Sequence, residues 1–505
     1  MHNPVTATSR LKHKAAAVLE VLDRCVERHP SPIMGAILLA YIGRAFLFSR
    51  ITELKIDELL TYSDVQLASL SKLWWTLKNF PPALDPPLHP VLAFFAFRLP
   101  LAFPLSFRLP AILGYGAMML SIFILLRRRG PAAVALIASL IPMLIPAFQY
   151  AIQSRPYALV LGFSGWALVF WQRAAEHRTR RKGALIGLYL CLSGVLLSHY
   201  LGGLVFIPLV AGELWRSLRH RIDPAIWIVF AAAAAAVISY VPLLPAAAVY
   251  RISPWHGVIA ADLWQTYLLA IAPILVILTG LCALLWLIGR DRNHQQPAVG
   301  LREHECVAIA TFYFVPIISF IIGAVATHTY VDRYSLMFII AAAIATTVMI
   351  YYFTSRAFSS ALLLFLIIFA VWPAVKGAVD VPTQNTEGIT PANLPLLDSL
   401  PDLPIVEPVW HDYVRLDLFG PAKLKQRLIL VVDPADVKNE TNFALSTEAV
   451  HRALNVPKAS YEQFIRSHSQ FLLLGFGLRD QLLEDGRKLM LVGKIFQWDL
   501  YLVSQ

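Results

Sequence analysis

Long apolar segments, separated by short polar ones, fill residues 32–376 and constrain the fold more than any other feature of the sequence. A helix needs roughly 20 predominantly apolar residues to cross a membrane, and segments near that length predict about eleven spans. The predicted spans are 32–50, 109–126, 131–149, 157–172, 184–198, 201–215, 225–247, 263–289, 305–326, 334–353 and 358–376. Charged residues make up only 15% of the chain, against about 25% in soluble domains. We therefore expect a polytopic α-helical membrane protein.

Basic residues gather in short clusters between the apolar segments. Beyond the N-terminal arm, the clusters lie at 127–129, 173–183, 216–221 and 290–294. Lysine and arginine are enriched in cytoplasmic loops. All the clusters face the cytoplasm if the N-terminus does and if the segment 86–103 does not cross, so we expect 86–103 to form a helix in the outer interface. The net charge of +11 is divided among the clusters, so no nucleic-acid partner is expected.

Residues 377–505 differ in character from the preceding region, 1–376. Their apolar runs shorten to strand length, as in "LPIVEPV", "RLILVVD", "FLLLGF", "KLMLVG" and "WDLYLV". Helical patterns such as "YVRLDLFGPAKLKQ", "SYEQFIRSH" and "RDQLLEDGRK" lie between these runs. Alternating strands and helices favour a small α/β domain. The order of spans predicts that this domain lies on the outer side, together with the first outer loop, 51–108.

The first outer loop begins with an amphipathic pattern. Its apolar residues recur at helical spacing, namely Leu60, Leu67, Leu70, Trp74 and Leu77. The Trp74-Trp75 pair is typical of a membrane-interface anchor. Asp57 and Glu58 stand just after the first span. These two acids either complement the positive end of a helix or supply carboxylates for chemistry, and the sequence alone leaves both readings open.

Two arginines stand at span mouths on the same predicted side. Arg108, in "FRLP", either reaches out to lipid phosphate or forms an ion pair with Asp57 or Glu58. Arg155, in "QSRPY", is either an ordinary loop arginine or a phosphate ligand. The planar fork of donors on an arginine suits phosphate.

Two further polar motifs follow on this side. His199 and Tyr200 stand in a tight turn between spans, where a histidine packs more often than it binds a ligand. Asp332, Arg333 and Tyr334 open the tenth predicted span. Arg333 is either half of a surface ion pair, which contributes little stability, or a second phosphate contact.

Taken together, these residues place carboxylates, arginines, histidines and tyrosines on one side of the membrane. A carboxylate can take a proton from an acceptor hydroxyl, and cations can stabilise a departing phosphate. The set therefore suits group transfer from a lipid-linked phosphate donor. The sequence has no Gly-rich nucleotide-phosphate loop, and its four cysteines fit neither a disulfide framework nor a zinc spacing. We expect no metal and no cofactor.

Two other classes of protein compete with this interpretation. A transporter or lipid flippase is typically built from two related halves with broken helices, and the sequence has no internal repeat. A structural or sensor protein with an outer α/β domain leaves the polar motifs at the span mouths without a role.

Six short motifs in order carry a resemblance to a known family. They are "DE" after the first span, "DPPLHPVL", "LSFRLPAILG", "QSRPYAL", "SHYLG" and "DRYSLMF". Over roughly residues 32–350 the chain resembles GT-C-fold glycosyltransferases, in the group that contains protein O-mannosyltransferases and the lipid A aminoarabinose transferase. The tail resembles the small outer domain of some bacterial members.

The resemblance implies a GT-C architecture and transfer of a sugar, with inversion, from a polyprenyl-phosphate donor to a hydroxyl of a glycan, lipid or protein. It places the protein in the inner (plasma) membrane, with the reaction at the outer face. It implies Asp57 as catalytic base and Glu58 as the partner of Arg108. The implied substrate-binding residues are Asp85, His89, Arg155, Tyr157, His199, Tyr200, Asp332, Arg333 and Tyr334.

One position departs from the family pattern. Relatives often carry His or Lys immediately before the Pro-Pro pair, where this chain has Asp85. A cationic phosphate contact is therefore not expected at that residue, and His89 is the alternative.

Overall fold

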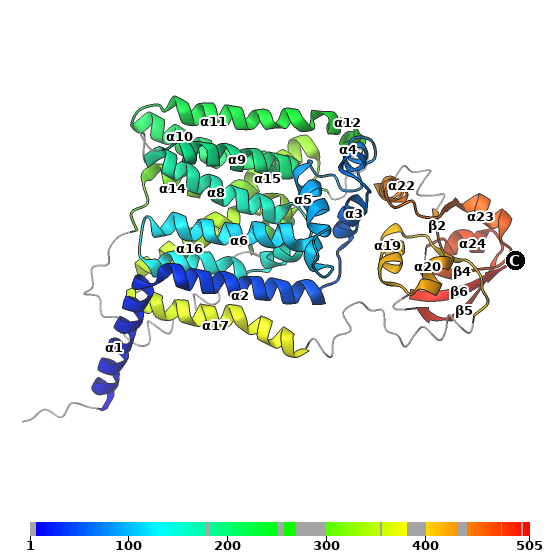
Figure 1. The fold of residues 1–505 in the computed structure, drawn as a ribbon, viewed down its shortest axis with the longest axis horizontal. Helices are drawn as coiled ribbons and strands as arrows, with labels where there is room; N and C mark the ends of the chain where they lie inside the picture. The colour runs from blue at the N-terminus through cyan, green and yellow to red at the C-terminus, as the bar shows by residue number, and fades with distance from the viewer. Residues whose placement is uncertain are drawn as a thin grey trace, which may run out of the picture.

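The computed structural model describes residues 7–176, 181–249, 257–268, 299–353, 356–380, 400–432, 442–475, 477–495 and 498–505. Over these residues the chain forms a bundle of helices and, beyond one end of it, a smaller domain built on a β-sheet (Figure 1). Most of the predicted span 263–289 lies outside the described residues.

The bundle consists of helices that run for the most part side by side (Figure 1). The α-helices are α1 (Ala7–Arg28), α2 (Pro30–Ile51), α6 (Leu105–Arg127), α7 (Ala132–Leu140), α8 (Tyr157–Glu176), α9 (Lys182–Ser198), α10 (Phe206–Arg219), α11 (Pro224–Ala234), α12 (Leu244–Val249), α14 (Glu303–Tyr313), α15 (Val315–Ile322), α16 (Phe338–Phe353) and α17 (Arg356–Asp380). The short 3₁₀ and π turns are η1 (Ile141–Met143), η2 (Pro146–Ile152), η3 (Tyr200–Val205), η4 (Ala235–Leu243), η5 (Gly323–Thr327) and η6 (Asp332–Ser335).

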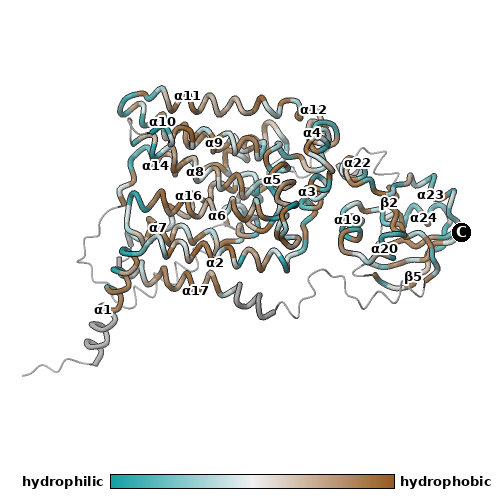
Figure 2. Tube along the Cα trace, viewed as in Figure 1, coloured by the Kyte–Doolittle hydropathy of each residue, from teal (hydrophilic) through white to brown (hydrophobic). Residues whose placement is uncertain are grey.

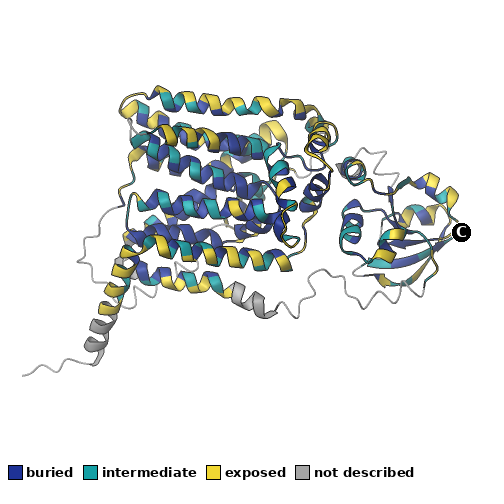
Figure 3. Cartoon of the chain, in the orientation of Figure 1, coloured by how far each residue is buried: buried dark blue, intermediate teal, exposed yellow. Residues whose placement is uncertain are grey.

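Within the described residues, four helical stretches are long and apolar enough to cross a membrane, or up to six if each of two bent pairs is one span. The predicted number of about eleven spans therefore stays a prediction. The helices of the bundle are predominantly apolar, as the hydropathy colouring of Figure 2 shows, and helices such as α2 and α11 are largely exposed in Figure 3. Large apolar side chains point outward there, for example Leu39, Leu113, Ile186, Ile228 and Ile368. Exposed apolar faces of this kind suit contact with lipid.

Helices α6 and α8 cross closely through glycines. A Cβ atom on Gly162 would lie 2.5 Å from the carbonyl oxygen of Gly114, and one on Gly114 would lie 2.6 Å from the carbonyl oxygen of Ala158. Small residues let helix backbones approach in this way inside membranes. Both helices begin at the same end of the bundle, so the crossing brings Arg108 near the start of α6 and Tyr157 at the start of α8 into one region.

The outer loop contains three short helices, α3 (Ile56–Val65), α4 (Leu70–Asn79) and α5 (Leu88–Phe97). The predicted single amphipathic helix is thus two helices, because Ser69 begins a new one: its Oγ accepts the backbone N–H of Lys72 at 3.2 Å, as an N-cap residue does. At 10 residues, α5 is too short to cross a membrane. That length agrees with the expectation that residues 86–103 do not cross the membrane.

The C-terminal domain is a six-stranded sheet in the order β3-β2-β1-β4-β6-β5. Its strands are β1 (Ile405–Glu407), β2 (Leu428–Val432), β3 (Lys458–Ser460), β4 (Phe471–Leu474), β5 (Lys488–Ile495) and β6 (Trp498–Ser504). Strands β1 to β4 pair in parallel and β6 is antiparallel to β4 and β5. Its helices are α19 (Trp410–Phe419), α20 (Ala422–Arg427), α22 (Asn442–Leu454), α23 (Tyr461–Ser467) and α24 (Arg479–Glu484). The expected α/β domain is confirmed, and each quoted run contains a strand.

This domain packs on the outer loop, at the end of the bundle where α3, α4 and α5 lie (Figure 1). Arg415 of α19 donates from Nη2 to the carbonyl oxygen of Leu54 at 3.2 Å. The guanidinium of Arg452 lies 3.7 Å from the ring centroid of Phe80. The domain therefore contacts the chain just before α3.

The opposite end of the bundle carries the basic clusters together with acidic partners. Arg127 at the end of α6 lies 3.5 Å from Glu27, and Arg129 donates to both carboxylate oxygens of Glu305. The described parts of the clusters therefore lie at the end away from the outer loop, as expected, whereas 290–294 and residues 177–180 of the cluster 173–183 lie outside the described residues. Which end faces the cytoplasm stays a prediction.

Candidate active site

Asp57 and Glu58 lie side by side in the first turn of α3 but have different surroundings. The backbone N–H of Lys55 donates to Glu58 Oε2 at 3.0 Å, the reciprocal contact of a capping box that starts a helix. Negative charge is also favoured here by the positive end of the helix dipole. Glu58 is fully buried, whereas the Asp57 side chain is 32% exposed.

The predicted ion pair between Glu58 and Arg108 is confirmed. Arg108 donates from Nε and Nη2 to the two carboxylate oxygens of Glu58, each at 2.9 Å, and both side chains are fully buried. Its remaining donors reach the backbone carbonyls of Ser49, Thr52 and Glu53. This two-pronged pairing joins the end of α2, the start of α3 and the start of α6.

The same carboxylate also holds the chain just before α8. The backbone N–H of Ser154 donates to Glu58 Oε1 at 2.8 Å. The next residue, Arg155, is thereby fixed beneath α3. Its Nη1 lies 3.4 Å from the carbonyl oxygen of Asp57 and 3.4 Å from Thr61 Oγ1.

Arg155 is paired with a buried carboxylate. Its Nη1 lies 3.3 Å from Asp85 Oδ2, and the side chains are 10% and 2% exposed. Burial alone would raise the pKa of Asp85, but the charge of Arg155 and the neighbouring His89 outweigh it and hold that pKa at about 2. His89 Nδ1 lies 3.4 Å from Asp85 Oδ2, and His89 is fully buried. Asp85 and His89 therefore lie behind Arg155.

Asp64 joins this buried cluster, although its sequence position did not mark it as a site residue. It is fully buried, and neither carboxylate oxygen has a hydrogen-bond partner among the described residues. Burial and, next, the charge of Asp85 raise its pKa well above the usual range. Asp57, Thr61 and Asp64 share one face of α3, because residues four and seven apart align on a helix. That spacing is the signal that could have revealed Asp64.

The carboxylate of Asp57 contacts Arg333, the second arginine that the sequence suggested as a phosphate contact. Arg333 Nη1, from η6, lies 3.2 Å from Asp57 Oδ2, and the two side chains are 33% and 32% exposed. The guanidinium carbon of Arg333 lies 5.9 Å from the ring centroid of Tyr157. This ion pair joins α3 to the turn before α16, two segments far apart in the sequence.

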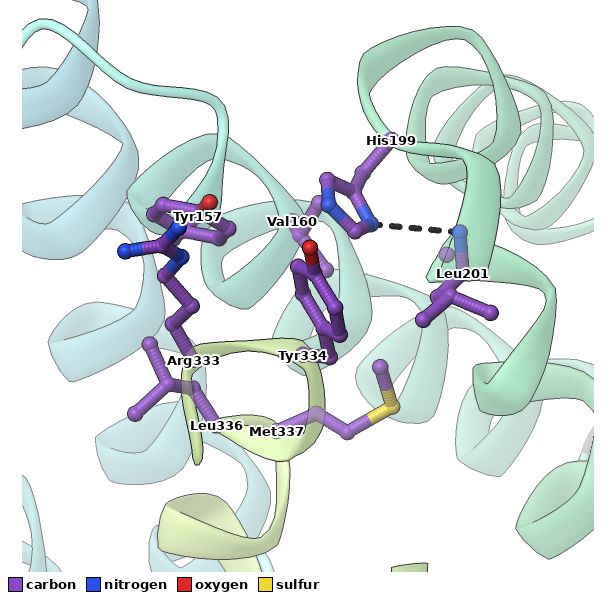
Figure 4. A pocket seen from close by; sticks show the side chains of 9 residues that line it. Tyr157, Val160, His199, Leu201, Arg333, Tyr334, Leu336 and Met337 are labelled. Atoms are coloured by element: carbon purple, nitrogen blue, oxygen red, sulfur yellow. Dashed lines mark hydrogen bonds between the residues drawn. The ribbon is translucent and has the colours of Figure 1, made fainter. Parts of the chain in front are cut away.

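Arg333 also lines a small cavity, whose lining residues are Tyr157, Val160, His199, Leu201, Gly202, Arg333, Tyr334, Leu336 and Met337 (Figure 4). The ring of His199 lies 5.5 Å from that of Tyr157 and 5.3 Å from that of Tyr334. His199 Nδ1 accepts the backbone N–H of Leu201 at 3.1 Å. A neutral His199 therefore carries its proton on Nε2, which leaves it a donor.

Two of the predicted substrate-binding residues have other contacts. The ring of Tyr200 packs edge-on against Tyr240, with 5.4 Å between the centroids. The side chain of Asp332 accepts the backbone N–H of Arg333 at 2.7 Å, so it shapes the turn that presents the arginine. Arg333 thus lines the cavity with Tyr157, His199 and Tyr334 and holds Asp57 beside it, and we call this group of five residues the mouth of the cavity. The cluster of Arg155, Asp85 and His89 lies beneath.

The fold is similar to that of a protein of known structure, ArnT. The crystal structure of ArnT from Cupriavidus metallidurans in the apo state matches with a TM-score of 0.60 at 13% sequence identity, covering 93% of this chain and 97% of that chain. The structure of the same ArnT bound to undecaprenyl phosphate matches with a TM-score of 0.59, at the same identity and coverage. The Archaeoglobus fulgidus oligosaccharyltransferase in the apo form matches with a TM-score of 0.45 at 13% identity, covering 88% of this chain and 69% of that chain.

No protein-family model matches the sequence, and no curated protein matches it either. At 13% identity the likeness to ArnT shows the fold. It confirms the GT-C architecture expected from the motifs.

Proposed function

We propose that this chain is a membrane glycosyltransferase that moves a sugar from a polyprenyl-phosphate donor to an acceptor hydroxyl on a glycan, lipid or protein, with inversion at the anomeric carbon. One observation carries the proposal: Asp57, a partly exposed carboxylate, lies 3.2 Å from Arg333 at the mouth of the cavity. The ArnT fold supports it, since one ArnT structure was bound to undecaprenyl phosphate.

Each residue at the mouth has a role in this reaction. Asp57 accepts the proton of the acceptor hydroxyl, whose oxygen attacks the anomeric carbon. The bond from that carbon to the phosphate oxygen breaks, and its electron pair leaves with the phosphate. Arg333 contacts the phosphate directly, and Arg155 adds its positive charge from beneath. His199 donates to the same region from Nε2, and charge that grows on the leaving phosphate is stabilised most in the transition state.

The base assignment is tested by Asp57→Asn, which keeps the size of the side chain and removes its basicity. Transfer of sugar from a polyprenyl-phosphate donor should fall by about 10²–10⁴, while the variant still binds polyprenyl phosphate. The assay follows release of polyprenyl phosphate by the purified protein in detergent. Glu53→Gln, which changes an exposed acid of the same loop, is the matched control and should retain turnover. Near-normal turnover of Asp57→Asn would remove Asp57 as the base.

The proposal places the protein in the inner (plasma) membrane, with the active site and residues 377–505 outside. The basic clusters at the far end of the bundle support this orientation. Single cysteines at Glu462, exposed in the C-terminal domain, and at His220, exposed after α10, test it in a cysteine-free background. An impermeant thiol reagent added to intact cells should label position 462 and not position 220. The reverse pattern would invert the topology.

A further inference from the structure

Arg333 faces two different environments. Its Nη1 contacts the carboxylate of Asp57 at 3.2 Å, while its side chain also lines the cavity beside Tyr157 and Tyr334 (Figure 4). Its Nε is buried and has no hydrogen-bond partner within the part of the chain that the structure describes. A guanidinium has five N–H donors in a planar fork. Donors therefore remain for a second anion.

A phosphate in the cavity would compete with Asp57 for this arginine. Arginine and phosphate pair through two parallel hydrogen bonds, which is a strong arrangement. The phosphate and the carboxylate are both negative, so they repel each other when both approach one cation. The existing pair is about one-third exposed on each side, and exposed ion pairs contribute little. A phosphate should therefore displace the carboxylate readily.

Among the ion pairs of the described residues, Arg155 contacts Asp85 and not the carboxylate of Asp57. Its contact with Asp57 is to the backbone oxygen, at 3.4 Å. Its own charge is engaged by Asp85 at 3.3 Å, behind the mouth. The carboxylate of Asp57 is therefore held by Arg333 alone among the ion pairs of the described residues.

We infer that the donor phosphate takes Arg333 from Asp57 and thereby frees Asp57 to act as the base, so that the enzyme loads its donor before it can deprotonate its acceptor. This inference rests on the proposed function. A carboxylate held by a cation accepts a proton less readily than a free one. Once Arg333 turns to the phosphate, the acceptor proton passes to Asp57 as the new bond forms and the bond to phosphate breaks.

The competition predicts a gain in affinity from removal of the base. Asp57→Asn should bind polyprenyl phosphate about two- to fivefold more tightly than the unmodified protein, because the carboxylate no longer competes for Arg333. Binding is measured on the purified full chain in detergent. Glu53→Gln, an exposed acid in the same loop, should bind as the unmodified protein does.

A double-mutant cycle separates this competition from simple charge repulsion. Arg333→Ala should weaken binding, and Asp57→Asn should add no affinity in that background, because no arginine remains to be released. Arg333→Lys keeps the charge without the fork and serves if the alanine variant does not fold. The inference is overturned if the gain persists without Arg333, or if Asp57→Asn alone binds no more tightly. If Arg333→Ala and Arg333→Lys both leave the affinity unchanged, the phosphate assignment in the proposed function fails as well.

Discussion

Neighbouring residues of α3 form two ion pairs that differ in almost every physical respect. Glu58 and Arg108 are fully buried and joined by two hydrogen bonds of 2.9 Å. Asp57 and Arg333 make one contact of 3.2 Å, with about a third of each side chain exposed. The first pair lies among backbone groups that use its remaining donors, and the second lies at the mouth of a cavity.

The contrast indicates which pair supports the fold and which supports the chemistry. A buried pair resists rearrangement, because breaking it leaves a charge without a partner in a medium of low dielectric constant. An exposed pair separates at little cost, which is what a base and a phosphate ligand need in order to exchange partners. Because Glu58 also orders Ser154 and Lys55, the rigid pair sets the position of the exchangeable one.

The largest expected effect on stability follows from removal of the buried arginine. Arg108→Ala leaves the Glu58 carboxylate unpaired, and breaking such a pair typically costs about 3–5 kcal/mol of folding free energy. Thermal unfolding in detergent should show the loss. Arg50→Ala, which removes an exposed arginine at the end of α2, should change stability little. Equal unfolding temperatures for the two variants would mean that the buried pair does not hold this end of the bundle.

A second effect on stability should depend on pH, because Asp64 of α3 is a buried acid. Burial raises the pKa of Asp64 well above its usual range, so its contribution to stability is full at low pH and is lost as pH rises through the folded pKa. Asp64→Asn does not titrate. Relative to that variant, the unmodified protein should lose about 1.4 kcal/mol of stability per pH unit between the unfolded pKa of an aspartate, about 3.9, and the folded pKa of Asp64, with no further loss above the folded pKa.

Unfolding of both proteins from about pH 4 to alkaline pH measures this difference, in which other titrating groups cancel. Glu53→Gln, an exposed acid, should show no such divergence from the unmodified protein. A constant offset between Asp64→Asn and the unmodified protein would mean that Asp64 is ionised, and that the cluster around Arg155 contains two charged acids.

The family resemblance predicted one of the two pairs, and the residues alone predicted only part of it. The "DE" motif and the "FRLP" arginine left Asp57 and Glu58 open as partners of Arg108, and the resemblance implied Glu58. The contact of Arg333 with Asp57 was not predicted, because it depends on how η6 packs against α3, and residues so far apart in sequence carry no local signal of contact. The pairing of Asp85 with Arg155 escaped prediction for the same reason.

The spacing of apolar residues likewise predicted where helices and strands lie better than it predicted where they are interrupted. Each apolar run quoted for the tail contains a strand, but β3, with three residues, is too short to give a pattern. The outer-loop helix was predicted as continuous because its apolar spacing continues through residues 66–69, whereas the side chain of Ser69 caps a second helix there. Capping depends on one hydrogen bond, which hydrophobic spacing does not record.

The smallest expected effect on stability is that of breaking the ion pair between Asp57 and Arg333. Removal of either member of this partly exposed pair should change the free energy of unfolding by only about 1 kcal/mol, near the upper end of the roughly 0.2–1 kcal/mol that exposed ion pairs contribute. Asp57→Asn and Arg333→Ala should therefore unfold near the temperature of the unmodified protein, although both lose transfer activity. Thermal unfolding and turnover measured on the same preparations separate the two outcomes. A loss of stability as large as that of Arg108→Ala would show that this pair, too, is part of the scaffold, and a structural pair of that strength could not exchange partners with a phosphate.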